Sequence, residues 1–168
     1  MIDWLFRAAY FSAYRMMRVY WRLRRPITHG ALVAVWHKGR ILLVRNSYVS
    51  YHTLPGGYLR RTESGVEAAQ RELLEEVGLR VGQDELRLCL DVTHSWEGKQ
   101  DHVQIFEVRA PDRPEVRVDH REVVAADFVS VAEALGRSLF PPLRDYLLQR
   151  ESAQDRSTVP GSPTPSVP

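Results

Sequence analysis

The sequence predicts a mixed α/β domain, and three observations support this fold class. Two apolar runs of strand length follow residue 29, a capped helical pattern covers residues 64–78, and further strand and helix patterns alternate up to residue 150. The chain has 168 residues, of which 44% are hydrophobic, which suits one domain with a genuine core. The single cysteine, Cys89, excludes an internal disulfide, and its place in "LRLCLDV" predicts a thiol in a strand interior.

Strands are predicted on both sides of the central helix. The stretch "GALVAVWHKGRILLVRN" has two apolar runs, which predict a hairpin with Lys38 and Gly39 near its turn. The later segments "ELRLCLDVTHSW" and "DHVQIFEVRA" predict two strands around the polar turn "EGKQ", and "EVVAADFVS" predicts another. The segments "VAEALGR" and "PPLRDYLLQR" predict helices, the second of which begins at proline.

The central helix is predicted to begin at about Gly65. Ser64 followed by Glu67 has the spacing of a capping box, and Gly78 suits the left-handed position that commonly ends a helix. At about 100° per residue, four apolar side chains share an arc of about 80° and are expected to face the core. These residues are Val66, Ala69, Leu73 and Val77.

An acidic face lies beside this apolar stripe. Glu72, Glu75 and Glu76 share an arc of about 100°, and like charges at this spacing destabilise a helix. Arg71 relieves some of the repulsion, but no basic residue lies three or four positions after Glu72, and Arg80, four positions after Glu76, lies beyond the predicted end of the helix at Gly78. Mg²⁺ takes carboxylate ligands together with substrate phosphates, so this face suits a metal ion. A solvated acidic helix surface is the alternative interpretation.

The wider spacing favours the metal site. The segment "GYLRRTESGVEAAQRELLEEVGL", residues 57–79, fits the pattern G-x5-E-x7-R-E-U-x-E-E-x-G-U at every specified position. This segment resembles the Nudix box, and a looser resemblance extends over residues 29–150. The preceding "LPGG" adds two glycines that allow the backbone to approach a metal or phosphate closely.

The resemblance implies hydrolysis of a pyrophosphate bond in a nucleoside diphosphate linked to another moiety, with Mg²⁺ or Mn²⁺. It also implies an α/β/α sandwich with a mixed sheet. Glu72 and Glu76 match the family's principal metal-binding carboxylates and Glu75 the third, while the Gly57 position contributes its carbonyl oxygen. Glu63 and Arg71 match residues that hold the loop and helix together.

Further site candidates lie outside the metal-binding positions. Glu122 lies in a region where the family often supplies an extra carboxylate as base or ligand. Arg45, Arg60 and Arg61 are close enough in sequence to clamp phosphate oxygens, although solvated arginines are the alternative. The substrate stays open between nucleotide sugars, nucleoside triphosphates, dinucleotides and capped RNA. A non-catalytic Nudix-fold module that binds a nucleotide or a partner is the alternative function, and the intact box argues against it.

Residues 1–26 form a separate basic segment. They hold six arginines and one acid, a net charge of +5, so that the remainder of the +2 chain carries 2 − 5 = −3. An amphipathic helix is predicted, with Phe6, Tyr10, Ala13, Met17 and Tyr20 opposite a face of arginines. Packing onto the domain or onto a second subunit as a homodimer, contact with an anionic membrane surface, and RNA binding are its three open roles.

These patterns divide the chain into three parts. We expect an N-terminal helix over 1–26, a Nudix domain over 27–150, and a disordered tail rich in Ser and Pro over 151–168. The sequence shows no signal peptide and no run of 18 apolar residues. We therefore expect a cytoplasmic enzyme, either free or bound to a membrane surface.

Overall fold

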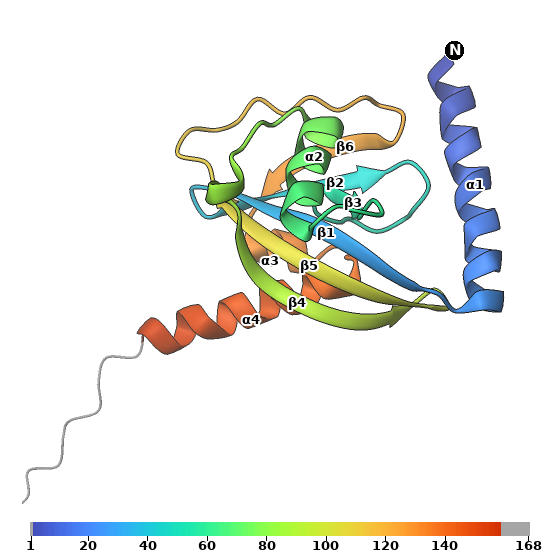
Figure 1. Cartoon of the computed structure of the whole chain (residues 1–168). Coiled ribbons are helices and arrows are strands. Elements are labelled where there is room, and N and C mark those ends of the chain that lie inside the picture. Colours follow the sequence, from blue (N-terminus) through green and yellow to red (C-terminus); the bar gives the residue numbers. More distant parts are fainter. Residues whose placement is uncertain (1, 159–168) are drawn as a thin grey trace, which may run out of the picture.

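The computed structural model describes the backbone of residues 2–158 and the side chains of residues 3–153. Helices and strands alternate along the chain as the sequence predicts (Figure 1). The elements are α1 (Ile2–Arg24), β1 (Ile27–His37), β2 (Arg40–Asn46), β3 (Gly56–Tyr58), α2 (Gly65–Val77), the 3-10 helix η1 (Gln83–Glu85), β4 (Arg87–Trp96), β5 (Lys99–Arg109), β6 (Val123–Val129), α3 (Val131–Leu135) and α4 (Pro141–Thr158).

The strands form one mixed sheet. Its order is β4-β5-β1-β2-β6, with the short β3 paired to β1. β1 and β5 run parallel, from Ile27 opposite Gln100 to Trp36 opposite Arg109, whereas the other pairs are antiparallel. The predicted hairpin between β1 and β2 is confirmed, with Lys38 and Gly39 at positive φ in its turn.

Helices cover both faces of the sheet, which confirms the predicted α/β/α sandwich (Figure 1). Successive residues of β1 point to opposite faces, so Val33 packs with Leu73 of α2 while Ala34 packs with Leu143 of α4. Each face therefore has its own apolar core. Within residues 2–158, no helix is long and apolar enough to cross a membrane.

The boundaries of α2 confirm the local prediction. The Ser64 hydroxyl accepts from the Glu67 backbone N–H, and the Glu67 carboxylate accepts from the Ser64 backbone N–H at 2.8 Å. Gly78 closes the helix in the left-handed conformation, with φ 72°. Ala69, Leu73 and Val77 are buried as expected, whereas Val66 is half-buried.

The C-terminal boundary differs from the prediction. We expected disorder from about Glu151, but α4 continues to Thr158, so that expectation is wrong for residues 151–158. The segment "ESAQDRST" contains neither glycine nor proline, and extending an existing helix adds one hydrogen bond for each residue that is fixed. The remainder of the predicted tail, residues 159–168, lies outside the described part of the chain.

A buried polar network anchors α4 to the sheet. The Tyr146 hydroxyl donates to Glu107 of β5 at 2.5 Å and accepts from the Trp36 indole N–H at 2.9 Å. The Arg150 guanidinium contacts the same Glu107 carboxylate and lies over the Trp36 ring, 4.3 Å from its centroid. The Glu107 carboxylate thus accepts from Tyr146 and pairs with Arg150, which allows this charge to be buried.

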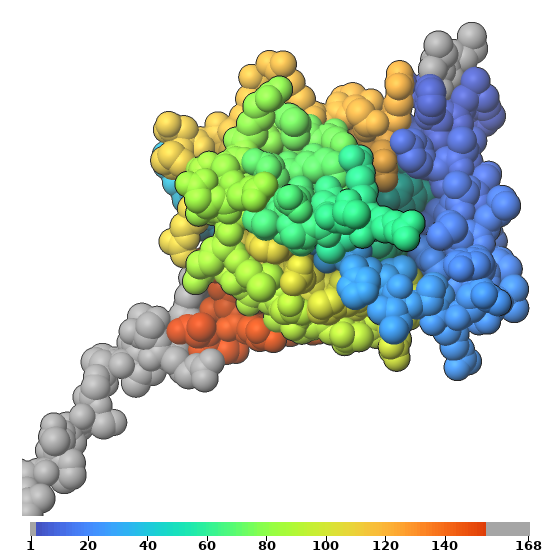
Figure 2. All heavy atoms as spheres, in the orientation of Figure 1, coloured from blue at the N-terminus to red at the C-terminus, as the bar shows by residue number. Residues whose placement is uncertain are grey.

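Helix α1 packs against the side of the domain that carries β3 and the turn between β4 and β5 (Figure 2). Trp21 is its most buried side chain, at 4% exposed, and meets the Tyr58 ring edge to face. This surface includes three members of the predicted stripe, Tyr10, Ala13 and Met17, which line a cavity together with Trp21. Phe6 and Tyr20 of the stripe are exposed, although the Arg121 guanidinium lies over the Phe6 ring, 4.5 Å from its centroid.

Candidate active site

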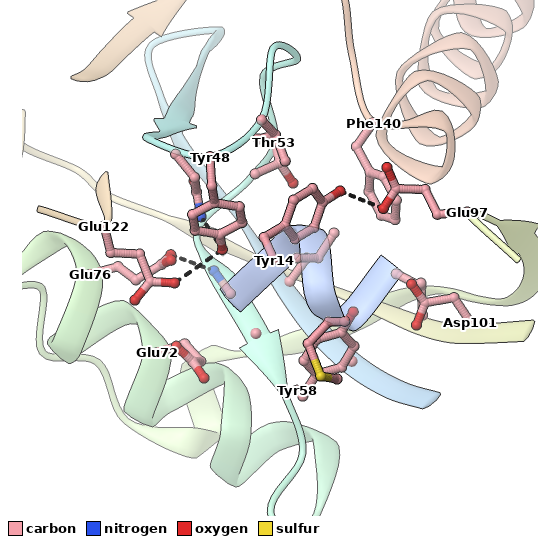
Figure 3. A pocket seen from close by; sticks show the side chains of 18 of the residues that line it. Tyr14, Tyr48, Thr53, Tyr58, Glu72, Glu76, Glu97, Asp101, Glu122 and Phe140 are labelled. Atoms are coloured by element: carbon pink, nitrogen blue, oxygen red, sulfur yellow. Dashed lines mark hydrogen bonds between the residues drawn. The ribbon is translucent and has the colours of Figure 1, made fainter. Parts of the chain in front are cut away.

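The candidate site forms where β3 lies against α2 (Figure 3). The Gly56 backbone N–H donates to the Glu76 carboxylate at 2.8 Å. A Cβ atom at Gly56 would lie 2.2 Å from the Ala31 carbonyl oxygen, and one at Gly57 would lie 2.4 Å from Glu72 Oε1. Both glycines are therefore required for β3 to approach the two carboxylates this closely.

Arg71 joins the loop before α2 to the helix. Its guanidinium donates to both oxygens of Glu63, at 2.7 and 2.9 Å, and to the Tyr58 carbonyl at 3.2 Å. The same side chain contacts Glu72 at 2.5 Å and Glu75 at 3.1 Å. The contact with Glu72 corrects the expectation that this carboxylate lacks a nearby cation, because Arg71 reaches it from the adjacent position.

Burial differs sharply among the three carboxylates of α2. Glu76 is 8% exposed, and its burial raises the pKa of its carboxyl to about 8, with further contributions from the charges of Glu72 and Glu122. Burial also raises the pKa of Glu72, although Arg71 opposes this shift. Glu75 is half exposed and pairs with Arg60 at 3.2 Å. A buried carboxylate without a paired cation favours neutralisation, by a proton or by a metal ion.

Glu122 approaches Glu76 from the loop that leads into β6 (Figure 3). Its carboxylate accepts from the Tyr48 hydroxyl at 3.1 Å and interacts with the hydroxyl of Tyr10 in α1. Its backbone carbonyl accepts from the Ser47 N–H at 2.7 Å, which ties the loop to the end of β2. Burial raises the pKa of Glu122 above its usual range.

A cavity of about 590 Å³ opens beside these carboxylates. Helix α1 supplies one of its walls, where the Tyr14 hydroxyl donates to Glu97 and Arg18 pairs with the same carboxylate at 3.3 Å. Aromatic rings from α1, β3, β4 and the loops surround the cavity. They are Tyr10, Tyr14, Trp21, Tyr48, Tyr51, Tyr58, Trp96 and Phe140.

The carboxylate cluster has the right chemistry for a hard divalent cation. The charges of Glu72 and Glu122 disfavour ionisation of Glu76, and the charge of Glu122 disfavours ionisation of Glu72, which is the condition that a bound cation relieves. Within the described residues, no three acidic, His or Cys side chains are arranged to coordinate one ion as they stand.

The structure sorts the sequence-predicted residues into two groups. Those that line the cavity are Gly57, Arg60, Arg71, Glu72, Glu75, Glu76 and Glu122, and Glu63 supports Arg71 from behind. Arg45 and Arg61 are exposed and do not line the cavity. Sequence reasoning missed the aromatic wall, although the density of Tyr and Trp in residues 1–26 was an available signal.

Comparisons with known proteins agree with this geometry. The NUDIX domain model matches residues 26–154. The MutT protein from Methanosarcina mazei Go1 superposes with a TM-score of 0.67 and 22% identity, covering 78% of this chain and 97% of that one. A MutT NUDIX hydrolase from Burkholderia pseudomallei superposes with a TM-score of 0.65 and 25% identity, covering 73% of this chain and 97% of that one. A C. elegans Ap4A hydrolase superposes with a TM-score of 0.64 and 18% identity, covering 77% of this chain and 98% of that one. No curated protein sequence matches the chain significantly.

The family match covers most of the chain, and the glycine loop and glutamate-rich helix lie within it. The chain therefore belongs to the NUDIX family of pyrophosphohydrolases.

Proposed function

We propose that this enzyme hydrolyses a pyrophosphate bond in a nucleoside diphosphate linked to another moiety, such as a sugar, further phosphate or a second nucleotide, using Mg²⁺ or Mn²⁺. One observation carries the proposal: the buried Glu76 carboxylate meets Glu72 and Glu122 at the edge of a cavity lined by aromatic rings. These acids lie in a cavity, carry charge and belong to a NUDIX domain, and all three facts favour a role in binding and cleaving a nucleotide over a purely structural role.

Glu72, Glu75, Glu76 and the Gly57 carbonyl would hold the divalent ion. When bound, such an ion neutralises phosphate oxygens and lowers the pKa of an attacking water. Glu76 is held in place by the Gly56 N–H, and Arg71 keeps Glu72 and Glu75 close to the loop of β3. The three carboxylates are thus presented on α2, and the Gly57 carbonyl is presented on β3 beside it.

Glu122 is the best-placed proton acceptor for the attacking water. It lies close enough to Glu76 for their charges to interact, and the Tyr48 hydroxyl fixes one of its oxygens. Its pKa is raised, which makes it a stronger base than an exposed glutamate. Arg60 lines the same cavity, and its one ion pair with a described residue is the exposed contact with Glu75, so its guanidinium can turn to a phosphate oxygen.

The aromatic wall provides the surface for the nucleoside. Stacking of a base on an aromatic ring stabilises the complex by about 1–3 kcal/mol and tolerates different bases. Tyr14 and Tyr48 lie 5.0 Å apart between ring centroids, and Tyr14 belongs to α1. Helix α1 therefore forms part of the proposed substrate site.

The test is a turnover assay of the full chain against nucleotide sugars, nucleoside triphosphates, dinucleotides and capped RNA, with Mg²⁺, with Mn²⁺ and with a chelator. We expect metal-dependent release of products cut at a pyrophosphate bond from at least one of these substrates. Binding of nucleotides without turnover of any substrate would instead support a non-catalytic binding module. Turnover that continues at full rate in the chelator would contradict the role given to the metal.

A further inference from the structure

Helix α1 has a second face that its own domain does not cover. Helix geometry, at about 100° per residue, places four large apolar residues within an arc of about 60°, on the side opposite Trp21. We call this the outer face, and its members are Leu5, Met16, Val19 and Leu23. Their exposed fractions run from 60% to 78%, whereas Trp21 is 4% exposed. An apolar surface of this kind on one helix marks a binding site for something outside the domain.

Positive charge borders the outer face. Arg15 and Arg22 lie along one edge of it, together with the exposed rings of Trp4 and Phe11. Arg15 contacts the Phe11 ring at 5.5 Å from its centroid, and among the described residues no carboxylate pairs with Arg15 or Arg22. The net charge of +5 on residues 1–26, set against −3 on the rest of the chain, shows that the basic residues concentrate on this helix.

We propose that the outer face docks on an anionic lipid bilayer. Leucine, methionine and valine would enter the boundary between headgroups and acyl chains, while Arg15 and Arg22 would pair with lipid phosphates. Apolar and arginine-rich faces with aromatic residues are typical of helices that lie in the plane of a membrane interface. Each arginine near an anionic surface strengthens binding by about 1 kcal/mol, which corresponds to about five-fold in partitioning.

A second copy of this chain and an RNA are the two other occupants considered for the outer face; charge argues against the first, and the apolar side chains argue against the second. In a symmetric dimer through this face, the same patch meets itself, so that the arginines of both copies would be brought together. An RNA backbone would satisfy the arginines, but it would leave Met16, Val19 and Leu23 exposed to water. An anionic bilayer is the surface that accommodates both the charge and the apolar side chains.

The opposite face of α1 remains available to the enzyme. Tyr10, Tyr14 and Trp21 face the cavity, and the ion pair of Arg18 with Glu97 holds the helix against the domain. Docking through the outer face therefore does not need α1 to leave its place in the site. Membrane binding and hydrolysis can be measured separately, because different residues carry them.

The experiment is flotation of the full chain with vesicles of phosphatidylcholine alone or mixed equally with phosphatidylglycerol, at low and at physiological ionic strength. We expect binding to the mixed vesicles only, and weaker binding as salt increases. The double variant Arg15→Gln/Arg22→Gln should lose about 30-fold in partitioning. Met16→Ser/Leu23→Ser should lose at least about 10-fold, because two apolar side chains no longer enter the bilayer.

Matched controls separate this surface from general effects. Leu148→Ser changes an exposed leucine on α4, and Arg80→Gln removes an exposed arginine outside α1, so both variants should bind like the unmodified chain. Far-UV circular dichroism and melting temperature would confirm that every variant is folded. Equal partitioning of the outer-face and control variants would overturn the proposal. So would a dimer in sedimentation velocity that the Met16→Ser/Leu23→Ser variant converts to monomer, since a second copy would then be the occupant.

Discussion

The Gly56 backbone N–H donates a 2.8 Å hydrogen bond to the buried carboxylate of Glu76. This single bond is the polar support that β3 gives to a side chain only 8% exposed, and burial raises the pKa of that carboxyl to about 8. A neutral carboxyl and a metal-bound carboxylate are the two states that relieve the cost of burying this group.

Glu76→Gln is expected to lower turnover at saturating substrate by at least about 100-fold, because the amide keeps the shape and loses the charge that holds the cation. Glu72→Gln should behave similarly. Steady-state kinetics with the substrate found in the turnover assay provide the measurement, and Glu115→Gln, an exposed glutamate remote from the cavity, is the matched control. Full activity of Glu76→Gln would remove this residue from the site.

The metal-free protein is expected to lose stability as pH rises from about 5 to about 8. A glutamate in the unfolded chain has a pKa of about 4.3, whereas Glu76 in the folded protein has a pKa of about 8. Between these two pH values the Glu76 carboxyl keeps its proton in the folded state and loses it in the unfolded state. Raising the pH through this window therefore favours unfolding. Burial lowers the pKa of His52, so this residue makes stability rise with pH below about pH 6.5, opposite to Glu76. Comparison of the unmodified chain with Glu76→Gln separates the contribution of Glu76 from that of His52.

Urea denaturation at several pH values, in the presence of a chelator, measures this effect. Glu76→Gln should show a flatter dependence of the free energy of unfolding on pH than the unmodified chain. Identical pH dependences for the two proteins would mean that Glu76 is ionised normally in the folded state.

Glu63→Gln is expected to lower the melting temperature and to reduce activity less than Glu76→Gln does. The two bonds from Arg71 hold the loop against α2 and lower the pKa of Glu63 to about 2, and the amide can accept only part of this interaction. Differential scanning calorimetry provides the measurement. An unchanged melting temperature would show that the ion pair does not stabilise the loop.

Tyr14→Ala is expected to raise KM by about 10-fold with a smaller effect on kcat, because a ring that stacks on the substrate contributes about 1–3 kcal/mol to binding. Tyr20→Ala, on the same helix but outside the cavity, is the matched control. If the two variants have the same KM, α1 does not contribute to substrate binding in solution.

Local signals accounted for much of the fold. Ser64, Glu67 and Gly78 set the boundaries of α2 through contacts within a few residues, and Lys38 and Gly39 set the first hairpin in the same way. The spacing from Gly57 to Gly78 identified the family, and the structure brings three glutamates of that segment, Glu72, Glu75 and Glu76, to one cavity. Which of them bind metal stays a prediction.

Contacts between distant segments could not be predicted in this way. Tyr14 meets Glu97 across 83 positions, and no local pattern specifies which side of α1 packs on the turn between β4 and β5. The burial of Glu76 also depends on tertiary packing, because helix periodicity placed it beside Glu75, which is half exposed. Residues 151–158 were assigned to the tail by composition, although their helix continues from α4.

The most direct test of the central claim is a set of thermal melts of the unmodified chain and of Glu76→Gln, in Mg²⁺ and in Na⁺ of equal ionic strength. Binding of Mg²⁺ at ten times its Kd stabilises the folded state by about 1.4 kcal/mol, which raises the melting temperature by about 2–4 °C in a domain of this size. We predict this rise for the unmodified chain in Mg²⁺ only, together with a higher metal-free melting temperature and a smaller Mg²⁺ shift for Glu76→Gln. Equal shifts in both salts for both proteins would contradict the account, since the carboxylates of α2 would then respond to ionic screening alone.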